Sequence, residues 1–308
     1  MAVASPLPVS VRRRRIRWRE HAVGYAFLAP WLVGFFAFVA GPMVASALLA
    51  FSDYNVILPP RWVGLSNFQA LAQDQRFYLS LYNTAYYTFL GVPAQLAVAL
   101  ALALLLNTRV RFADAFRSAY YIPTVAPVVA SIYLWVWMFN YDYGLINALV
   151  RLIGLAPVQW LWDPQVTKIS IIIFSLTRVG TQMIIFLAGL QGVPDTLLEA
   201  ASIDGATAWH RFRHIVLPMI SPVIFFNLVI GIIGSFQVFT TAYLATNGGP
   251  AYGSLFYVLY LYQSAFEFLK MGYASALAWV LFLIILVFTL LQFRIADRWV
   301  YYEGGVSR

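Results

Sequence analysis

The sequence predicts an all-α polytopic membrane protein with six transmembrane helices. Hydrophobic residues make up 62% of the 308 residues and charged residues only 10%, whereas a soluble domain has about 45–50% apolar and about 25% charged residues. Six stretches with little or no charge each reach the roughly 20 residues that a helix needs to cross a bilayer. The alternating pattern of barrel strands is absent. These observations exclude an ordinary cytosolic enzyme.

Uncharged length places the spans in chain order. They divide the chain into a basic tail over residues 1–22, a six-helix transmembrane domain over 23–295 and a second tail over 296–308. The expected spans are 23–51, 81–106, 119–140, 168–190, 219–246 and 271–293.

The first span has an alternative interpretation as a signal peptide. An arginine tract precedes an apolar run, and Ala45-Ser46-Ala47 resembles a small-residue cleavage site. The apolar run before that site is about twenty residues long, whereas a signal peptide has a run of about 7–15. The length therefore favours an uncleaved span, with the arginines as a topology anchor that can contact anionic lipid.

The distribution of basic residues predicts that both termini are cytoplasmic. The tail 1–22, the loops 107–118 and 191–218 and the C-terminal segment from Arg294 onward together carry 14 basic and 7 acidic residues, while the alternate segments carry five of each. Basic residues mark the cytoplasmic side, so the net charge of +8 indicates topology and no nucleic-acid partner is expected. The apolar stretch 255–263 is too short to span, and we expect an aromatic helix at the outer interface.

Chemistry based on cysteine is excluded, because the chain has no cysteine. Its three histidines are His21, His210 and His214. The last two have a spacing that could hold zinc, but no acidic or third imidazole ligand lies near them in sequence, so no metal site is expected.

The connection over residues 191–222 is the only long cytoplasmic segment between spans. Pro194 ends the preceding structure, and Thr196 with Glu199 has the spacing of a capping box that starts a first helix. The Asp204-Gly205 pair then breaks this helix, and Asp204 is placed to cap a second helix.

The second helix carries an apolar face and ends at the membrane. Trp209, Phe212 and Val216 recur at helical spacing, while Pro218 and Pro222 end the helix. By pattern alone, this segment could equally be an interfacial amphipathic helix.

A longer pattern in this connection identifies a family. The segment contains the spacing EAA-x2-DGA-x5-F-x4-LP, which resembles the coupling-loop signature of inner-membrane permease subunits of binding-protein-dependent ATP-driven importers. Three further stretches, Trp160–Pro164, Leu187–Leu190 and the TNGGP sequence Thr246–Pro250, resemble the carbohydrate-importer subgroup. The last is similar to the first permease of maltose, multiple-sugar and glycerol-phosphate systems. The residues that the resemblance assigns to ATPase coupling are Glu199, Ala200, Ala201, Asp204, Gly205, Ala206, Trp209, Phe212, Leu217 and Pro218.

The resemblance also implies the partners and the location. We expect a second permease, a cytoplasmic ATPase dimer, an extracytoplasmic solute-binding protein and a sugar-like solute, with the chain in a prokaryotic inner membrane and surrounded by lipid. The chain itself is expected to be non-catalytic and to bind no cofactor, because ATP and Mg would be used by the ATPase. Neither of its two lysines, Lys168 and Lys270, lies in a phosphate-binding loop.

Two other function classes remain as alternatives. A self-contained secondary transporter or channel would need no ATPase, but all twelve carboxylates lie outside the predicted spans, so a buried proton relay lacks support. A membrane enzyme or scaffold has no catalytic constellation in its favour.

Arg178 is the one charged residue deep in a predicted span. Such a group normally faces a cavity or a partner, and its alternative is structural pairing with backbone carbonyls or with the second permease. Polar residues in spans can also serve as contacts between helices; Asn83 and Gln95 are weaker candidates. Position in the span and the resemblance to a maltose-type permease together place Thr177, Arg178, Thr181, Gln182, Asn227, Gly231, Ser235 and Val238 on the substrate pathway.

Overall fold

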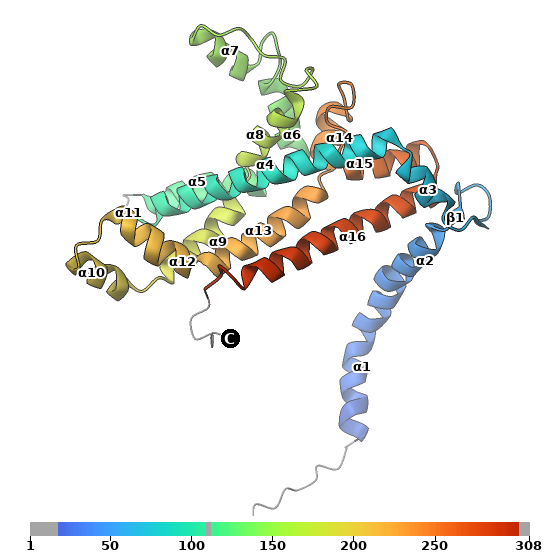
Figure 1. The fold of residues 1–308 in the computed structure, drawn as a ribbon, viewed down its shortest axis with the longest axis horizontal. Helices are drawn as coiled ribbons and strands as arrows, with labels where there is room; N and C mark the ends of the chain where they lie inside the picture. The colour runs from blue at the N-terminus through green and yellow to red at the C-terminus, as the bar shows by residue number, and fades with distance from the viewer. Residues whose placement is uncertain (1–17, 109–111, 302–308) are drawn as a thin grey trace, which may run out of the picture. The chain divides into compact units, whose positions relative to one another are not determined.

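The computed structural model describes residues 18–108 and 112–301, most of them in helices (Figure 1). Most of the predicted basic tail lies outside the described residues, as do Arg109, Arg111 and Arg308. Contacts divide the chain into one unit that ends at Leu48 and a second that begins at Leu49.

The first unit is a single apolar helical segment, which matches the first predicted span. It passes from α1 (Trp18–Phe35) through a π-helical turn, η1 (Phe36–Ala40), into α2 (Gly41–Leu49). The Gly41 N–H bonds to the Phe36 carbonyl five residues back. A Cβ at Gly41 would lie 2.8 Å from that oxygen, so the widened turn depends on glycine at this position. Residues Val23–Leu49 are long and apolar enough to cross a membrane.

The second unit contains two long helices and three bent pairs that also pass the length and hydropathy test for a span. Three elements near its start are short: the antiparallel strands β1 (Ser52–Asp53) and β2 (Arg61–Trp62), and the helix α3 (Ser66–Ala72). The long helices are α4 (Gln75–Leu106) and α16 (Met271–Ala296). The bent pairs are α5 (Ala113–Val125) with α6 (Val128–Met138), α8 (Thr167–Leu176) with α9 (Gly180–Gln191), and Ala208–Met219 with α13 (Ser221–Phe236).

Prolines lie close to two of the three bends, and none lies at the break between α8 and α9. The α5–α6 bend of 96° follows Pro123 and precedes Pro127; proline cannot donate a backbone hydrogen bond and restricts the residue before it. The α8–α9 bend is 48°, and the bend before α13 is 63°. Each bent pair can count as one broken span and overlaps a predicted span, at 119–140, 168–190 and 219–246, but the sequence analysis did not predict the breaks.

The fifth predicted span, 219–246, is interrupted in the structure. Helix α13 ends at Phe236, and a separate helix, α14 (Thr240–Thr246), follows after a short break. The helix α4 instead starts six residues before the predicted boundary at 81, because Asp74 caps it by accepting a hydrogen bond from the Arg76 N–H at 2.8 Å.

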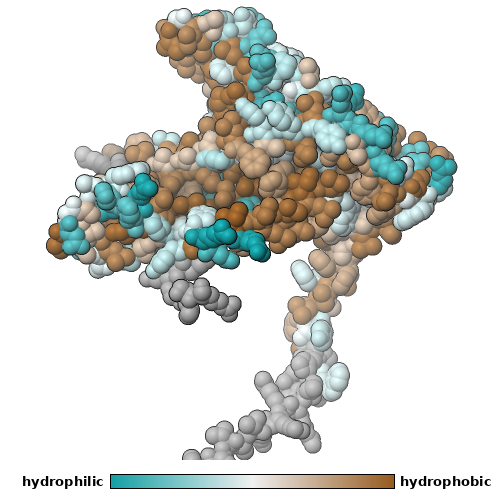
Figure 2. All heavy atoms as spheres, viewed as in Figure 1, coloured by the Kyte–Doolittle hydropathy of each residue, from teal (hydrophilic) through white to brown (hydrophobic). Residues whose placement is uncertain are grey.

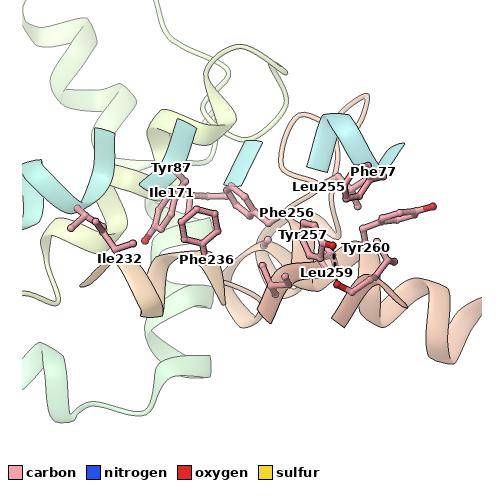
Figure 3. Close-up of a cluster of buried hydrophobic side chains, with 14 of the residues drawn as sticks. Phe77, Tyr87, Ile171, Ile232, Phe236, Leu255, Phe256, Tyr257, Leu259 and Tyr260 are labelled. Atoms are coloured by element: carbon pink, nitrogen blue, oxygen red, sulfur yellow. Dashed lines mark hydrogen bonds between the residues drawn. The ribbon is translucent and has the colours of Figure 1, made fainter. Parts of the chain in front are cut away.

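The largest core lies where α4, α13 and α16 run side by side and meet α15 (Tyr257–Tyr262) (Figure 1). Rings in this core pack edge to face or tilted: Phe77 against Tyr257 and Tyr87 against Phe256 (Figure 3), and Phe236 against Phe288. The sequence predicted this aromatic segment at an interface. Its side chains Phe256, Tyr257 and Leu259 are instead completely buried in protein.

Polar groups of α4 explain that burial. The Thr84 hydroxyl accepts a hydrogen bond from the Tyr257 N–H at 2.9 Å, and the Asn83 amide donates to the carbonyls of Tyr252 and Leu255. The segment therefore enters the core with its backbone groups satisfied.

Hydrophobic surface covers the middle of the helices in the second unit, and hydrophilic atoms gather toward their ends (Figure 2). The remaining short elements are α7 (Leu145–Leu152), α10 (Asp195–Ile203), α11 (Ala208–Arg211), the π-helical turn η2 (Phe212–Val216), α12 (Leu217–Met219) and the π-helical turn η3 (Gln263–Glu267). Helices α10 to α12 lie at one end of the bundle, and α3 and β1 lie at the other (Figure 1). This arrangement suits a polytopic membrane protein.

Candidate functional site

The 191–218 segment folds into two helices joined by a tight turn. After α10, the Gly205 N–H bonds to Ser202 O at 3.1 Å and the Ala206 N–H bonds to Ala201 O at 2.9 Å. Gly205 has φ of +79°. This is a Schellman end, in which the left-handed residue after the helix is usually glycine. The predicted break at Gly205 is confirmed.

The caps of both helices differ from the prediction. Pro194 precedes α10 with an extended backbone and without a side-chain cap, so Thr196 lies inside the helix and no capping box forms. Asp204 ends α10, and the Thr207 hydroxyl caps α11 by accepting from the His210 N–H at 3.3 Å. The Schellman turn takes up Asp204, Gly205 and Ala206, so Thr207 is the residue that immediately precedes the second helix.

The second helix ends between Pro218 and Pro222, the two prolines predicted to end it. It continues through η2 and α12 to Met219, and Pro218 lies in the first turn of α12. There, the missing N–H of proline is tolerated because η2 has already changed the hydrogen-bond register. The bend at Ile220 then starts α13.

A groove of about 410 Å³ separates α10 from the second helix. Phe212 and Val216 line it, as do Leu198 and Glu199 of α10. The Arg211 guanidinium donates to the Ser202 hydroxyl across the groove. The two helices are thereby held as one body.

The outer surface of this body is apolar in part. Ile203 is 86% exposed and Trp209 is 63% exposed, although the Trp209 ring contacts that of Phe212 at 5.6 Å. Such large apolar side chains at the end of a helix bundle indicate a partner surface. Of the other residues assigned to coupling, Glu199, Ala200, Asp204 and Gly205 are exposed, and Ala201, Ala206, Leu217 and Pro218 are half-buried.

The two histidines of this body use ring nitrogens within the body. The His210 Nδ1 lies 3.1 Å from the Thr207 hydroxyl, and the His214 Nδ1 lies 3.1 Å from the His210 carbonyl. Within residues 18–108 and 112–301, no group of three or more metal-ligating side chains comes together.

Arg178, from the first group of predicted pathway residues, contacts the α5–α6 bend. The Arg178 guanidinium donates to the carbonyls of Pro123 at 2.8 Å and Thr124 at 3.1 Å, and to the Ser131 hydroxyl at 3.2 Å. It satisfies carbonyls that a helix end leaves without partners. This is the pairing with backbone carbonyls that the sequence left open. Thr177 bonds back to Phe174 O, Thr181 is exposed, and the Gln182 Oε1 is buried without a hydrogen-bond partner among the described residues.

The second group lies on α13 and, for Val238, just after it; Gly231 and Ser235 of this group contact α4 of the same chain. Ser235 is buried and donates to the Thr88 hydroxyl at 2.9 Å. A Cβ at Gly231 would lie 3.0 Å from Val92. Asn227 is buried and bonds to Val223 O, while Val238 is half-buried against the main core. The α4–α13 contact thus holds this stripe, and its role in substrate contact stays a prediction.

Sequence reasoning missed Gly180, at the start of α9. Its N–H donates to the Thr124 hydroxyl at 3.1 Å, and a Cβ would lie 2.6 Å from that oxygen and 2.9 Å from Tyr120 O. A glycine inside an apolar span is the available signal for such a close approach of helices.

Sequence reasoning also missed a polar cluster at the end of the bundle opposite α10 to α12. The Asp74 carboxylate accepts from the hydroxyls of Tyr260 and Tyr273, beside a cavity of about 500 Å³. Burial raises the pKa of Asp74, but these hydrogen bonds and those from backbone N–H groups outweigh it, so the pKa lies below its usual value. The three residues are far apart in sequence, and no local pattern joins them.

Comparison with known proteins adds a family match, two relatives and one solved structure. Residues 82–301 match the family described as binding-protein-dependent transport system inner membrane component. The chain is 40% identical over 298 residues to the probable ABC transporter permease protein YesP of Bacillus subtilis, with 95% of this chain and 96% of the relative covered. It is 35% identical over 300 residues to the arabinooligosaccharides transport system permease protein AraP of the same organism, with 94% and 95% covered. It is also similar to a crystal structure of a bacterial ABC transporter involved in the import of the acidic polysaccharide alginate, with a TM-score of 0.80, 25% identity, and 91% of this chain and 96% of that chain covered.

Proposed function

Because the chain belongs to the family of binding-protein-dependent transport system inner membrane components, we propose that it forms half of the translocation pathway of an ATP-driven importer. Its relatives include permeases of sugar transport systems, and the chain is accordingly a permease subunit of a sugar importer. We propose further that the imported solute is a di- or oligosaccharide or a related compound.

The observation that carries the proposal is the body formed by α10 to α12. The residues with the EAA-x2-DGA spacing lie on α10 and its Schellman turn, and the exposed Ile203 and Trp209 flank that turn. We propose that this surface docks into an ATPase subunit and transmits its movement to α13 through the bend at Ile220. ATP and Mg are then used by the ATPase, and this chain remains non-catalytic and binds no cofactor.

The topology that fits this function has six spans, with both termini and the coupling body in the cytoplasm of a prokaryote. The excess of basic residues on the segments assigned to that side supports it. The remaining proposed partners are a second permease, an ATPase pair and an extracytoplasmic solute-binding protein; the family description mentions a binding protein, and a similar transporter was solved in complex with a periplasmic protein. Thr177, Arg178, Thr181 and Gln182, with the α13 stripe, are proposed to approach the solute when the spans repack during transport.

ATP-dependent uptake tests the proposal. The variant Ile203→Asp changes an exposed side chain, so we expect the protein to insert normally and uptake to fall to background. Ile203→Val keeps the apolar surface and is expected to transport like the wild type. Full uptake by Ile203→Asp, or uptake that needs no ATP, would favour the alternative of a self-contained secondary transporter or channel.

A further inference from the structure

Lys168 is a cation that the fold holds in place without an anion. It lies in the first turn of α8 and is half-buried. Within the described part of the chain, no carboxylate oxygen lies within the 4.0 Å that defines an ion pair with its ammonium group. The Lys168 Nζ donates one hydrogen bond, to the Asn83 Oδ1 at 3.1 Å.

The surroundings of this ammonium group are rigid. Asn83 is fully buried, and its amide nitrogen is fixed by the carbonyls of Tyr252 and Leu255. The Lys168 Nζ also lies 5.6 Å from the ring centroids of both Tyr82 and Tyr86, within the range of a cation–π contact. Lysine usually loses much rotamer entropy when it binds a ligand, and these contacts reduce that loss in advance.

The unpaired charge requires an explanation. Ionisable residues inside membrane spans are costly and usually pair with another group or face a solute path, and Lys168 is the half-buried first residue of the fourth predicted span. An ammonium group has three donors, and the structure uses one of them. Two donors therefore remain for an acceptor, and the neighbouring rings cannot accept them as well as an anionic oxygen can.

Tyr82 supplies a second recognition element. Its side chain is 60% exposed, while Tyr86 beside it is half-buried, and the two ring centroids lie 6.4 Å apart. An exposed aromatic face beside a cation suits a ligand that has an apolar ring face and a negative charge. A sugar that carries a carboxylate has both.

We propose that Lys168, Tyr82 and Asn83 form a subsite that binds the carboxylate of an acidic sugar, such as a uronate residue of an oligosaccharide. The Lys168 ammonium donates to the carboxylate, the Tyr82 ring packs against the sugar, and Asn83 positions the lysine. This inference rests on the proposed importer function and specifies its substrate class. The import of an acidic polysaccharide by the structurally similar transporter is compatible with it.

A lipid phosphate offers the same chemistry as a sugar carboxylate, so the experiment must separate the two. Uptake is measured in host cells that express the full importer, with oligosaccharides from digested pectate and digested alginate. The control ligands are the same oligosaccharides after carboxyl reduction, which keeps the rings and linkages and removes the charge. The variants are Lys168→Gln and Lys168→Arg, and Lys270→Gln is the matched control because Lys270 is the only other lysine in the chain.

We expect the wild type to take up an acidic oligosaccharide in preference to its reduced form. Lys168→Gln should raise the KM for the acidic ligand at least about tenfold, since a charged hydrogen bond is lost, with little change for the reduced ligand. Lys168→Arg should retain most of the preference, and Lys270→Gln should resemble the wild type.

Three results would overturn the subsite. The first is wild-type uptake of reduced ligands only; the second is an equal loss for both ligand forms in Lys168→Gln, which would indicate a structural role. The third is a dependence of activity on phosphatidylglycerol, in vesicles of the purified complex, that Lys168→Gln abolishes, because the anion would then be a lipid headgroup. Failure of the importer function itself is recognised separately, by uptake that persists in Ile203→Asp or without ATP.

Discussion

The Arg178 guanidinium lies 2.8 Å from the carbonyl oxygen of Pro123, a residue 55 positions earlier in the chain. This contact joins the α8–α9 break to the α5–α6 bend, so the one charged side chain deep in a predicted span stabilises a bend of 96°.

Loss of this contact should destabilise the protein. Arg178→Met leaves helix-end carbonyls without donors, and each unsatisfied buried group costs about 1–3 kcal/mol, so we expect a clear fall in Tm in mild detergent. Arg178→Lys should recover only part of the lost Tm, because a lysine side chain has no forked donor group. Arg151→Met is the control: Arg151 also donates to two carbonyls, but it is exposed, and its Tm should change much less. Equal effects at both positions would contradict this account of Arg178.

The Gly205 turn should be needed for coupling more than for folding. Gly205→Ala has open space around the added Cβ, so its cost is the left-handed backbone alone, about 1–2 kcal/mol. We expect a small loss of stability and a marked fall in ATP-dependent uptake, and abolished uptake for Gly205→Pro, because proline cannot adopt this φ.

Gly154 provides a matched control for Gly205. It has φ of +80° and equally open surroundings, but lies outside the coupling body. Gly154→Ala should cost similar stability and leave uptake intact; if it reduced uptake as much as Gly205→Ala does, the turn would have no special part in coupling.

Added side-chain volume on α13 should destabilise the protein only on the side that faces α4. Gly231→Leu places bulk against Val92 of α4 and should cost about 1–3 kcal/mol by overpacking. Gly234→Leu, three residues later, meets nothing within 4 Å of the added Cβ and should be nearly neutral. Thermal unfolding of both variants measures the difference, and a stable Gly231→Leu protein with altered sugar preference would place Gly231 on the pathway instead.

Asp74 should stabilise the protein only above acidic pH. Because its pKa is lowered in the folded state, its contribution is fully present above the unfolded-state pKa of about 3.9 and is lost as pH falls through the folded-state pKa. The difference in Tm between wild type and Asp74→Asn should therefore be constant from about pH 5 to 8 and shrink below about pH 4. A difference that changed near pH 7 would implicate another group.

Local rules account for what the sequence predicted well. Span length follows from bilayer thickness, so the first span and the long cores of α4 and α16 were located from uncharged runs. The Gly205 break was found because a helix end needs a left-handed residue. Pro194 displaced the expected capping box, since an extended proline starts α10 one residue before Thr196.

Long-range pairing explains what the sequence could not predict. The partners of Arg178 lie on another helix, and a stripe such as Asn227 to Ser235 fits a solute path or a neighbouring helix equally well. The aromatic segment around Tyr257 looks interfacial until Thr84 is known to accept its N–H.

The central claim is that the body of α10 to α12 docks onto an ATPase, and site-directed cross-linking tests it most directly. The chain has no cysteine, so Ile203→Cys introduces a single reactive thiol at an exposed position, and Leu152→Cys, at an 80% exposed site on α7, is the control. In native membranes we predict that position 203 cross-links to a protein that mass spectrometry identifies as an ATP-binding subunit, and that position 152 does not. A functional importer in which position 203 never reaches such a subunit would contradict the account.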